Sequence, residues 1–330
     1  MGKHGKVQTA LEYLAARTIL TGLRWMPRRL SVAAGRGMGR IAYAVGGRLR
    51  RAGTRNLELA FPEMDAHERE RILRGCFRNL GRLLGEFSHF GHATPDSLSR
   101  IFEVEGLEHL EAAEARGRGV ILFTGHVGAW ELTSFALSAL GHKVDFLARR
   151  IDNPLIEGVV EKTRTRFGNR SIDKRAAARP MLRTLNSGGR LGLLIDLNTH
   201  PHEGVFVDFF GIPALTTSSL ATLALRTGAA TLPIFAPWDE ERGRFLLKIE
   251  PPVSIQPTGE QEEDVRALTA AVTSVVEKYV RQYPEQWLWI HKRWNTRPAG
   301  EADLYASRTQ EMKSGAGEVL TDDLKAQGQG

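Results

Sequence analysis

The apolar and polar positions along the chain predict an alternation of buried strands and amphipathic helices. Residues 120–123 form a short, wholly apolar run, which is typical of a strand buried on both faces of a parallel sheet. After a break at residues 124–125, apolar positions recur at helical spacing through residues 129–140, and Gly141 follows as a stop signal. The same periods predict further strands near residues 102–104, 144–148, 191–195, 231–235 and 245–249, and helices near residues 72–87, 107–115, 155–160, 176–185, 216–225 and 262–283. We therefore expect an α/β fold with a mixed, mostly parallel sheet flanked by helices.

The first 52 residues have a different pattern, in which Lys and Arg are interspersed with Leu, Trp and Met. It predicts two amphipathic helices, over residues 7–24 and 31–47, with basic residues beside both. Helices of this kind can lie in a bilayer interface, where basic side chains meet anionic headgroups. The alternative is that they pack on the domain with their basic faces in water. Because both helices and the net charge of +7 agree, we expect residues 1–52 to associate with an anionic membrane surface.

The remaining sequence divides into one domain and a tail. We expect residues 53–297 to form a single α/β domain, and residues 298–330, which are polar and Gly-rich, to be disordered. No run of ~18 uncharged apolar residues is present, and the N-terminus lacks the features of a secretory signal. The single cysteine, Cys76, excludes an intramolecular disulfide. These features predict a location on the cytoplasmic side.

A candidate catalytic pair lies where the strand at residues 120–123 leads into the following helix. His126 sits at the carboxyl end of the strand, the edge of an open α/β sheet where ligands bind, and Glu131 follows five positions later. A carboxylate on one imidazole nitrogen fixes the tautomer and leaves the other nitrogen free as a general base. A lone His near a strand end is more often a hydrogen-bonded core or loop residue. The carboxylate and the glycines on either side favour the catalytic interpretation here.

Other polar residues also follow predicted strands. Arg149 comes after the strand at residues 144–148, and either binds a phosphate or carbonyl oxygen or forms a surface salt bridge. Asn153 precedes Pro154, and a helix cap with Pro at the first position is sufficient to explain it. Asp196 ends the strand at residues 191–195 and is a second possible partner of the His126 imidazole.

Residues 199–216 are predicted to form a long loop, and loops of that length are usually functional. Phe206, Phe209 and Phe210, followed by Gly211, either line a tunnel for an apolar chain or pack into the core. His200 and His202 form a local pair of potential metal ligands, but no further ligand cluster accompanies them, so we expect no metal.

Several ordered blocks together resemble the lipid A biosynthesis acyltransferases, a branch of the lysophospholipid and glycerophosphate acyltransferases. Residues 124–132, Thr-Gly-His-Val-Gly-Ala-Trp-Glu-Leu, carry the His-x4-Glu motif of that branch. The block at residues 204–214, Gly-Val-Phe-Val-Asp-Phe-Phe-Gly-Ile-Pro-Ala, is similar to the family's corresponding block. The family's Arg-x3-Asn-Pro block is also present, at Arg149 to Pro154. The family usually has Asp-Gln where this chain has Asp196 followed by Leu and Asn198.

The resemblance implies a glycerophosphate acyltransferase-like fold and an O-acyltransferase at the inner membrane. The expected donor is an acyl thioester of acyl carrier protein or CoA, and the acceptor is a hydroxyl group of a lipid A precursor or related glycolipid; no cofactor is expected. A lysophospholipid or phosphatidylinositol mannoside acceptor is the alternative. His126 and Glu131 are the expected catalytic pair, with the backbone N–H groups near Gly128 stabilising the oxyanion. Substrate contacts are expected from Arg149, Asn153, Asp196, Phe206, Phe209, Phe210 and Gly211.

Functions of other classes account for less of the sequence. A serine hydrolase of the Gly-x-Ser-x-Gly type and a zinc hydrolase of the His-Glu-x-x-His type both lack their motifs here. A basic protein that only binds membranes or nucleic acid would explain the net charge. It would not explain a His and a carboxylate spaced at a strand end, so we expect no nucleic-acid partner.

Overall fold

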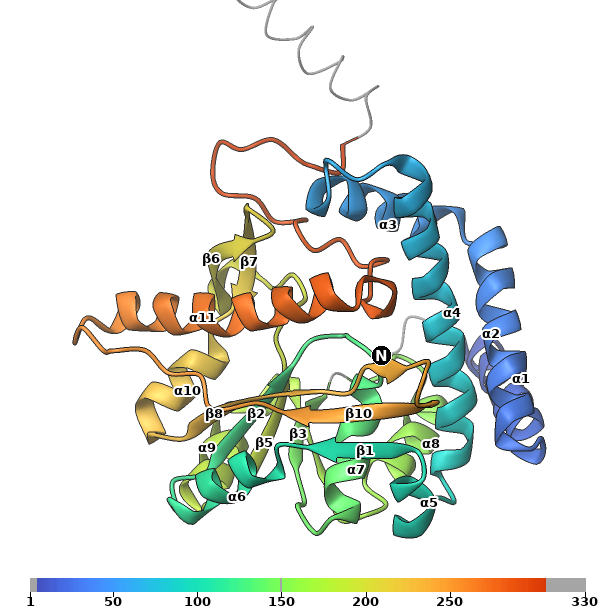
Figure 1. Ribbon diagram of the computed structural model, residues 1–330, viewed down its shortest axis with the longest axis horizontal. Helices are drawn as coiled ribbons and strands as arrows, with labels where there is room; N and C mark the ends of the chain where they lie inside the picture. Colours follow the sequence, from blue (N-terminus) through green and yellow to red (C-terminus); the bar gives the residue numbers. More distant parts are fainter. Residues whose placement is uncertain (1–4, 149, 307–330) are drawn as a thin grey trace, which may run out of the picture.

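A mixed, mostly parallel β-sheet lies at the centre of the computed structural model, which describes residues 5–148 and 150–306 (Figure 1). Its strands are β1 (Phe102–Glu105), β2 (Val120–Thr124), β3 (Asp145–Ala148), β4 (Arg170–Asp173), β5 (Arg190–Leu194), β8 (Ala230–Phe235), β9 (Trp238–Asp239) and β10 (Arg244–Ile249). They follow the order β1-β10-β8-β2-β5-β3-β4, and β9 pairs with β10. Neighbours are parallel except where β10 meets β8 and β9. The predicted α/β fold is confirmed.

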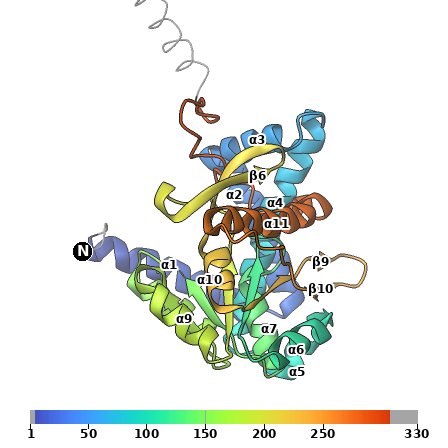
Figure 2. The ribbon, with the colours of Figure 1, turned by 90° about the vertical axis from the view of Figure 1, so that its left-hand side faces the viewer.

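Helices lie on both faces of this sheet (Figures 1 and 2). They are α1 (Lys6–Trp25), α2 (Arg28–Val45), α3 (Gly47–Ala60), α4 (Ala66–Phe90), α5 (Pro95–Ser99), α6 (Leu107–Ala115), α7 (Thr133–Ala139), α8 (Pro154–Arg164), α9 (Ala178–Asn186), α10 (Ser219–Thr227) and α11 (Gln261–Gln282). Short 3-10 turns are η1 (Trp130–Leu132), η2 (Lys174–Ala176), η3 (Pro201–Glu203) and η4 (Pro284–Gln286). In Figure 1, α11 lies above the sheet and α5, α6 and α7 lie below it.

β2 is buried along its whole length, as its apolar sequence predicts. Its edges pair with β8 and β5, and its side chains alternate between two apolar cores. Ile121 and Phe123 enter the core that includes the buried face of α11, whereas Val120 and Leu122 enter the core beside α6 and α7. An all-apolar strand is therefore required here, because neither face meets water.

Two elements differ from the sequence expectation for local reasons. The helix expected over residues 129–140 begins as η1 before it continues as α7. β4 was not expected, because it lies at the end of the sheet and only Ile172 among its four residues is buried. An edge strand with one buried side chain carries no recognisable apolar alternation.

The predicted N-terminal helices are present as α1 and α2, and α2 packs closely on α4. Gly35 and Gly39 allow this approach, since a Cβ on either would overlap the α4 backbone at Gly81 or Phe77. The boundary that we expected after residue 52 falls inside α3, whose Leu57 is fully buried. None of the helices in residues 5–148 and 150–306 is both long and apolar enough to cross a membrane.

The loop expected over residues 199–216 is instead mostly a β-hairpin, so that prediction was wrong. β6 (Gly204–Phe209) pairs with β7 (Ile212–Thr217) in an antiparallel register, joined through Phe210 and Gly211, both with positive φ. The guanidinium of Arg293 is buried against this hairpin and donates to the carbonyl oxygen of Leu215 at 2.9 Å. Phe209 at the end of β6 and Phe210 in the turn thus pack against the tryptophans of the C-terminal segment.

The segment after α11 crosses back over the sheet edge and returns to α3. Asn56 on α3 donates to the carbonyl oxygens of Trp289 and His291, each at 2.6 Å. Tyr305 donates its hydroxyl to Asn56, so part of the tail expected to be disordered lies against the domain. Residues 307–330 lie outside the described residues.

Candidate active site

The pairing of β2 with β5 brings His126 and Asp196 together at the carboxyl edge of the sheet. In this parallel ladder Thr124 lies opposite Leu194, so the residues two positions later also lie opposite each other. The backbone N–H of Ile195 donates to the carbonyl oxygen of Thr124 at 3.2 Å and extends the ladder past the strand ends. Gly125 allows the close approach, because a Cβ there would lie 3.0 Å from an Asp196 carboxylate oxygen.

Asp196 contacts both the side chain and the backbone of His126. One carboxylate oxygen lies 2.7 Å from Nδ1 of the imidazole, and the other accepts the backbone N–H of His126 at 2.7 Å. A carboxylate can only accept, so Nδ1 carries the proton and Nε2 of the neutral ring is the basic nitrogen. No described residue hydrogen-bonds to that Nε2. The arrangement is that of an oriented general base.

Trp287 completes the surroundings of the carboxylate. Its indole Nε1–H donates to Asp196 at 2.7 Å, and both side chains are almost fully buried. Burial alone would raise the pKa of Asp196, but the charge of His126 and the hydrogen bonds from His126 and Trp287 outweigh burial and lower the pKa to about 2. Asp196 is therefore ionised at neutral pH and can stabilise an imidazolium at His126.

Glu131 is not the residue that orients His126, which corrects the sequence expectation. Its carboxylate accepts from Nε of Arg164 at 2.5 Å and from Nη2 at 3.1 Å, a two-point ion pair between the start of the 129–140 helix and the end of α8. Burial would lower the pKa of Arg164, but Glu131 raises it, so the cation persists. The carboxylate five residues after His126 thus holds a guanidinium, and the catalytic role expected for Glu131 stays a prediction.

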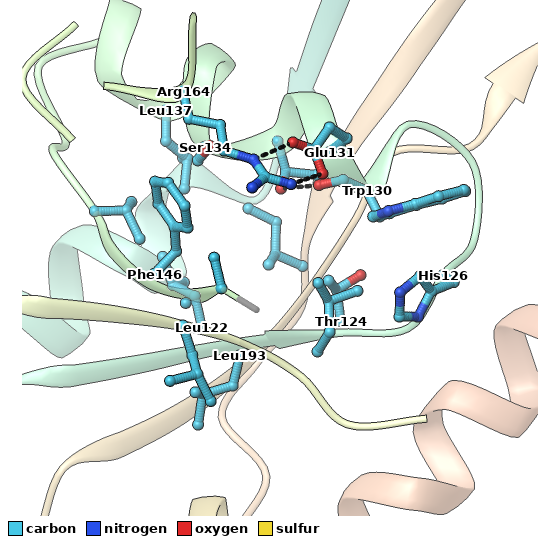
Figure 3. Close-up of a pocket in the computed structure, with 17 residues that line it drawn as sticks. Leu122, Thr124, His126, Trp130, Glu131, Ser134, Leu137, Phe146, Arg164 and Leu193 are labelled. Atoms are coloured by element: carbon cyan, nitrogen blue, oxygen red, sulfur yellow. Dashed lines mark hydrogen bonds and ion pairs between the residues drawn. The ribbon is translucent and has the colours of Figure 1, made fainter. Parts of the chain in front are cut away.

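His126, Glu131 and Arg164 nevertheless line one pocket, of about 220 Å³ (Figure 3). Figure 3 shows His126 beside Trp130 on one side of the pocket and the Glu131–Arg164 pair farther along the wall. The His126 and Trp130 rings lie 5.2 Å apart between centroids. The rest of the wall is mainly apolar, formed by Leu122, Leu137, Val144, Phe146, Leu147, Leu193, Leu194 and Ile234. A mainly apolar wall beside a basic imidazole suits a substrate with a fatty chain.

The backbone N–H groups near Gly128 already have partners, so the expected oxyanion hole is not available there. The N–H of Gly128 donates to the carbonyl oxygen of Gln286 at 3.1 Å, and that of Ala129 donates to Ala236 at 2.7 Å. Gly128 itself has φ of 63°, and a Cβ would overlap the carbonyl of Ala236. This turn is held for structure, against β8 and the segment after α11.

Asn153, one of the expected substrate-binding residues, lies at the start of α8. Asn153 caps that helix, accepting the N–H groups of Leu155 and Ile156 at 3.1 and 3.3 Å. It also donates to the carbonyl oxygen of Thr9 at 2.9 Å, which ties α8 to α1. The capping explanation is confirmed, and Asn153 does not line the pocket of His126. Arg149 lies outside the described residues.

Phe209 and Phe210 of the hairpin belong to the core, and none of its phenylalanines lines the pocket around His126. Phe209 is fully buried, with its ring 5.6 Å from Trp287 and 5.9 Å from Trp294. Phe210 packs edge-to-face on Phe61, at 5.2 Å. Phe206 is half-buried on β6, and Gly211 is exposed in the turn. Phe209 and Phe210 therefore fit the core interpretation, and the substrate contacts expected from Phe206, Phe209, Phe210 and Gly211 stay predictions.

Residues with metal-ligating side chains do not gather anywhere in the described part of the chain. No group of three or more His, Cys, Asp or Glu residues there has metal-site geometry. His200 and His202 stack at 5.8 Å with no acidic or thiol ligand grouped with them. Cys76 is buried on α4, and burial raises the pKa of its thiol to about 12.

Residue patterns did not single out Trp287 or Arg164, although both shape the site. Trp287 is 91 residues from Asp196, and its sequence neighbourhood carries no sign of a long-range hydrogen bond. Arg164 stands in the last turn of α8, where a cation is ordinary for helix stability. Neither the hydrogen bond of Trp287 nor the ion pair of Arg164 can be recognised from neighbouring residues, since each depends on which elements the fold brings together.

Comparisons with known proteins identify the family of the chain. The family profile of bacterial lipid A biosynthesis acyltransferases matches residues 4–296. The chain is 31% identical to the lipid A biosynthesis lauroyltransferase of Escherichia coli K12 over 292 residues, covering 86% of this chain and 92% of that protein. It is 32% identical to the palmitoleoyltransferase of the same organism over 253 residues, 76% and 80% of the two chains. A lipid A biosynthesis acyltransferase of Haemophilus influenzae is 27% identical over 270 residues, covering 81% and 83%. The protein therefore belongs to the bacterial lipid A biosynthesis acyltransferases and is an acyltransferase enzyme.

Proposed function

We propose that the enzyme transfers a fatty acyl chain from a thioester carrier to a hydroxyl group of a lipid A precursor at the inner membrane surface. The observation that carries this proposal is the Asp196–His126 pair, which leaves Nε2 free in a largely apolar pocket. The relatives' names, which specify lauroyl, palmitoleoyl and myristoyl transfer in lipid A biosynthesis, support the acyl group and the acceptor class.

In the proposed reaction the acceptor hydroxyl attacks the thioester carbonyl directly. Nε2 of His126 takes the hydroxyl proton as the new C–O bond forms, and Asp196 stabilises the imidazolium. The tetrahedral intermediate then loses the thiolate, which takes the proton from His126. The products are an ester and a free thiol, and no covalent acyl-enzyme forms, because the acceptor is itself the nucleophile.

The apolar interior of the pocket supports binding of the acyl chain next to His126. Leu137 and Phe146 belong to this wall, whereas Arg164 and Glu131 supply its charged part. Glu131 acts in this proposal as a positioning residue, which holds the Arg164 guanidinium in the wall.

The distribution of exposed apolar side chains supports membrane association of the N-terminal helices. Most of the large apolar side chains that the described residues expose lie between residues 7 and 49, among them Leu11, Leu14, Trp25 and Val45. An exposed apolar face beside Lys and Arg residues is typical of helices that lie in a bilayer interface. Asn153 fixes α1 against α8, whose last residue reaches the pocket.

The proposal is tested by assaying the purified enzyme with a lauroyl thioester and a lipid A precursor in detergent micelles. Mass spectrometry should show an added acyl group on the acceptor and one equivalent of free thiol. The His126→Ala protein, with an unchanged circular dichroism spectrum, should form no product. Product formation by that variant at the wild-type rate would refute the mechanism, and thiol release without acylation would refute transfer to the glycolipid.

A further inference from the structure

A basic groove lies beside the reaction pocket, between η2, α9 and α10. It encloses about 650 Å³, and its charged lining includes Lys174, Arg175, Arg179 and Arg226. Its inner wall is apolar. Leu147, near the carboxyl end of β3, lines both this groove and the pocket of His126. The basic groove and the reaction pocket therefore adjoin at Leu147.

The sheet topology explains why these cations lie near the site. β4 runs parallel to β3 and ends at Asp173, and η2 begins at the next residue. The basic side chains of η2 are thus placed at the carboxyl edge of the sheet, the edge that carries His126 and Asp196. Cations from two further elements, Arg179 on α9 and Arg226 on α10, face the same groove.

Most of the positive charge in the basic groove is uncompensated. Lys174 pairs with Glu203 at 2.8 Å. Arg175, Arg179 and Arg226 are exposed, and none of them forms an ion pair with another described residue. Their positions on three separate elements spread the charge over a surface wider than one phosphate group would need.

The helices that line the basic groove and the helices that expose apolar side chains lie on different sides of the molecule. In Figure 1, α9 and α10 lie on the left of the molecule, whereas α1 and α2 lie on the right. An enzyme bound to a bilayer through α1 and α2 would hold the basic groove toward water. A soluble acidic partner fits this position better than anionic lipid does.

We propose that the basic groove docks an acidic protein that carries the acyl thioester on a flexible arm, so that the arm passes Leu147 to reach His126. This inference rests on the proposed function and adds the side from which the donor approaches. Charged residues at the rim of such an interface mainly affect the rate of encounter and its salt dependence. Acceptor and donor would then reach His126 from different sides of the molecule.

The test is a double charge reversal, Arg175→Glu/Arg179→Glu, with Arg116→Glu/Arg118→Glu as the matched control. The control pair is exposed, changes the net charge equally, and lies just before β2, at the opposite edge of the sheet. Steady-state rates are measured with lauroyl-acyl carrier protein and with lauroyl-CoA. For the carrier protein, KM should rise by about ten-fold or more in the groove variant with kcat unchanged, and stay within about two-fold in the control. With lauroyl-CoA, both variants should resemble the wild type.

Two results would overturn the inference. One is an unchanged KM for lauroyl-acyl carrier protein in the groove variant. The other is an equal rise of the KM for lauroyl-CoA, which would mean that the groove binds a group common to both donors. Fluorescence anisotropy of labelled, unacylated carrier protein measures docking without turnover. The docking proposal can therefore be tested even if the wild type transfers no acyl group, a result that would refute the proposed function alone. If the double variant does not fold, Arg226→Glu on α10 should show the same selective loss.

Discussion

The Asp196 carboxylate binds His126 at two points, through Nδ1 of the ring and through the backbone N–H. The first contact sets the tautomer, and the second fixes the loop from which the imidazole projects. Because Trp287 donates to the oxygen that also accepts the His126 backbone N–H, the carboxylate itself has little freedom to rotate. The pair is therefore preorganised, and its cost in desolvation is offset by three hydrogen bonds to one buried carboxylate.

The first prediction ranks the carboxylates by their contact with the imidazole. Asp196→Asn should lower kcat by roughly 10²-fold or more, because an amide can present its N–H₂ to Nδ1 and stabilise the wrong tautomer. Glu131→Gln should cost less, since Glu131 contacts Arg164 and not His126. Steady-state kinetics on folded variants check the order. A larger loss for Glu131→Gln would show that the ion pair matters more than the orientation of the base.

The second prediction concerns stability at acidic pH. Burial opposes ionisation of Asp196, yet its pKa is lowered to about 2 from an ordinary value of 3.8. A lowered pKa in the folded state stabilises the fold above the unfolded pKa, and this contribution is lost as the pH falls toward the folded pKa. The free energy of unfolding of the wild type minus that of Asp196→Asn should therefore be constant above about pH 5 and shrink between pH 4 and 2. Urea titrations at several pH values measure it, and a difference that grows on acidification would contradict the assignment.

The sheet and its reactive edge could be predicted because they depend on local patterns. The run at residues 120–123 is apolar because both faces of β2 are buried. His126 lies at the reactive edge because the chain leaves the sheet just before it. Asp196 also follows a strand, so its position at the same edge was predictable. Which carboxylate contacts the imidazole was not predictable, because it depends on the register of β2 and β5, whereas proximity in the sequence favoured Glu131.

The hairpin was mistaken for a loop for a related reason. Phe209 and Phe210 are adjacent apolar residues, which breaks the alternation expected of a strand, and their partners are tryptophans almost 80 residues later. Their burial depends on the segment after α11 and on the buried Arg293 that binds β7. A pattern confined to neighbouring residues carries no information about such packing.

The third prediction tests whether Glu131 and Arg164 act as one unit. Glu131→Ala and Arg164→Ala should each destabilise the protein, and the double variant should be less unstable than the sum of the two, with a coupling of about 0.5–3 kcal/mol. Both side chains are mostly buried, at 26% and 17% exposure, so either single variant leaves a partly buried charge unpaired. A double-mutant cycle by urea denaturation gives the coupling. Simple additivity would mean that the two residues stabilise the protein independently.

The fourth prediction separates the wall of the pocket from the aromatic core. Phe146→Ala enlarges the pocket and should favour longer acyl chains, whereas Ala148→Leu fills it and should favour shorter ones, because a methylene in a pocket is worth about 1–3 kcal/mol. Phe209→Ala should instead lower the free energy of unfolding by about 3–5 kcal/mol with chain preference unchanged. Competition assays with a mixture of acyl thioesters measure the preference. A change in the preferred acyl chain length in Phe209→Ala alone would show that the hairpin contacts the acyl chain.

The fifth prediction concerns the membrane-facing helices. Leu11, Leu14 and Trp25 are 62%, 60% and 81% exposed, so replacing all three by Ser should leave the fold intact. Binding to vesicles that contain phosphatidylglycerol should weaken by at least ten-fold, because each buried methylene contributes about 0.8 kcal/mol. Leu140→Ser is the control, an exposed leucine after α7 that should bind vesicles like the wild type.

Replacement of these side chains is a sharper test than removal of residues 1–52. That deletion would end inside α3 and uncover the face of α4 on which α2 packs, so lost binding could reflect unfolding. The triple variant keeps both helices and every Lys and Arg, and thereby separates apolar insertion from charge attraction. Vesicle sedimentation at low and high salt makes the distinction, since charge attraction alone is screened by salt. A triple variant that still sediments fully at high salt would place the membrane anchor elsewhere in the chain.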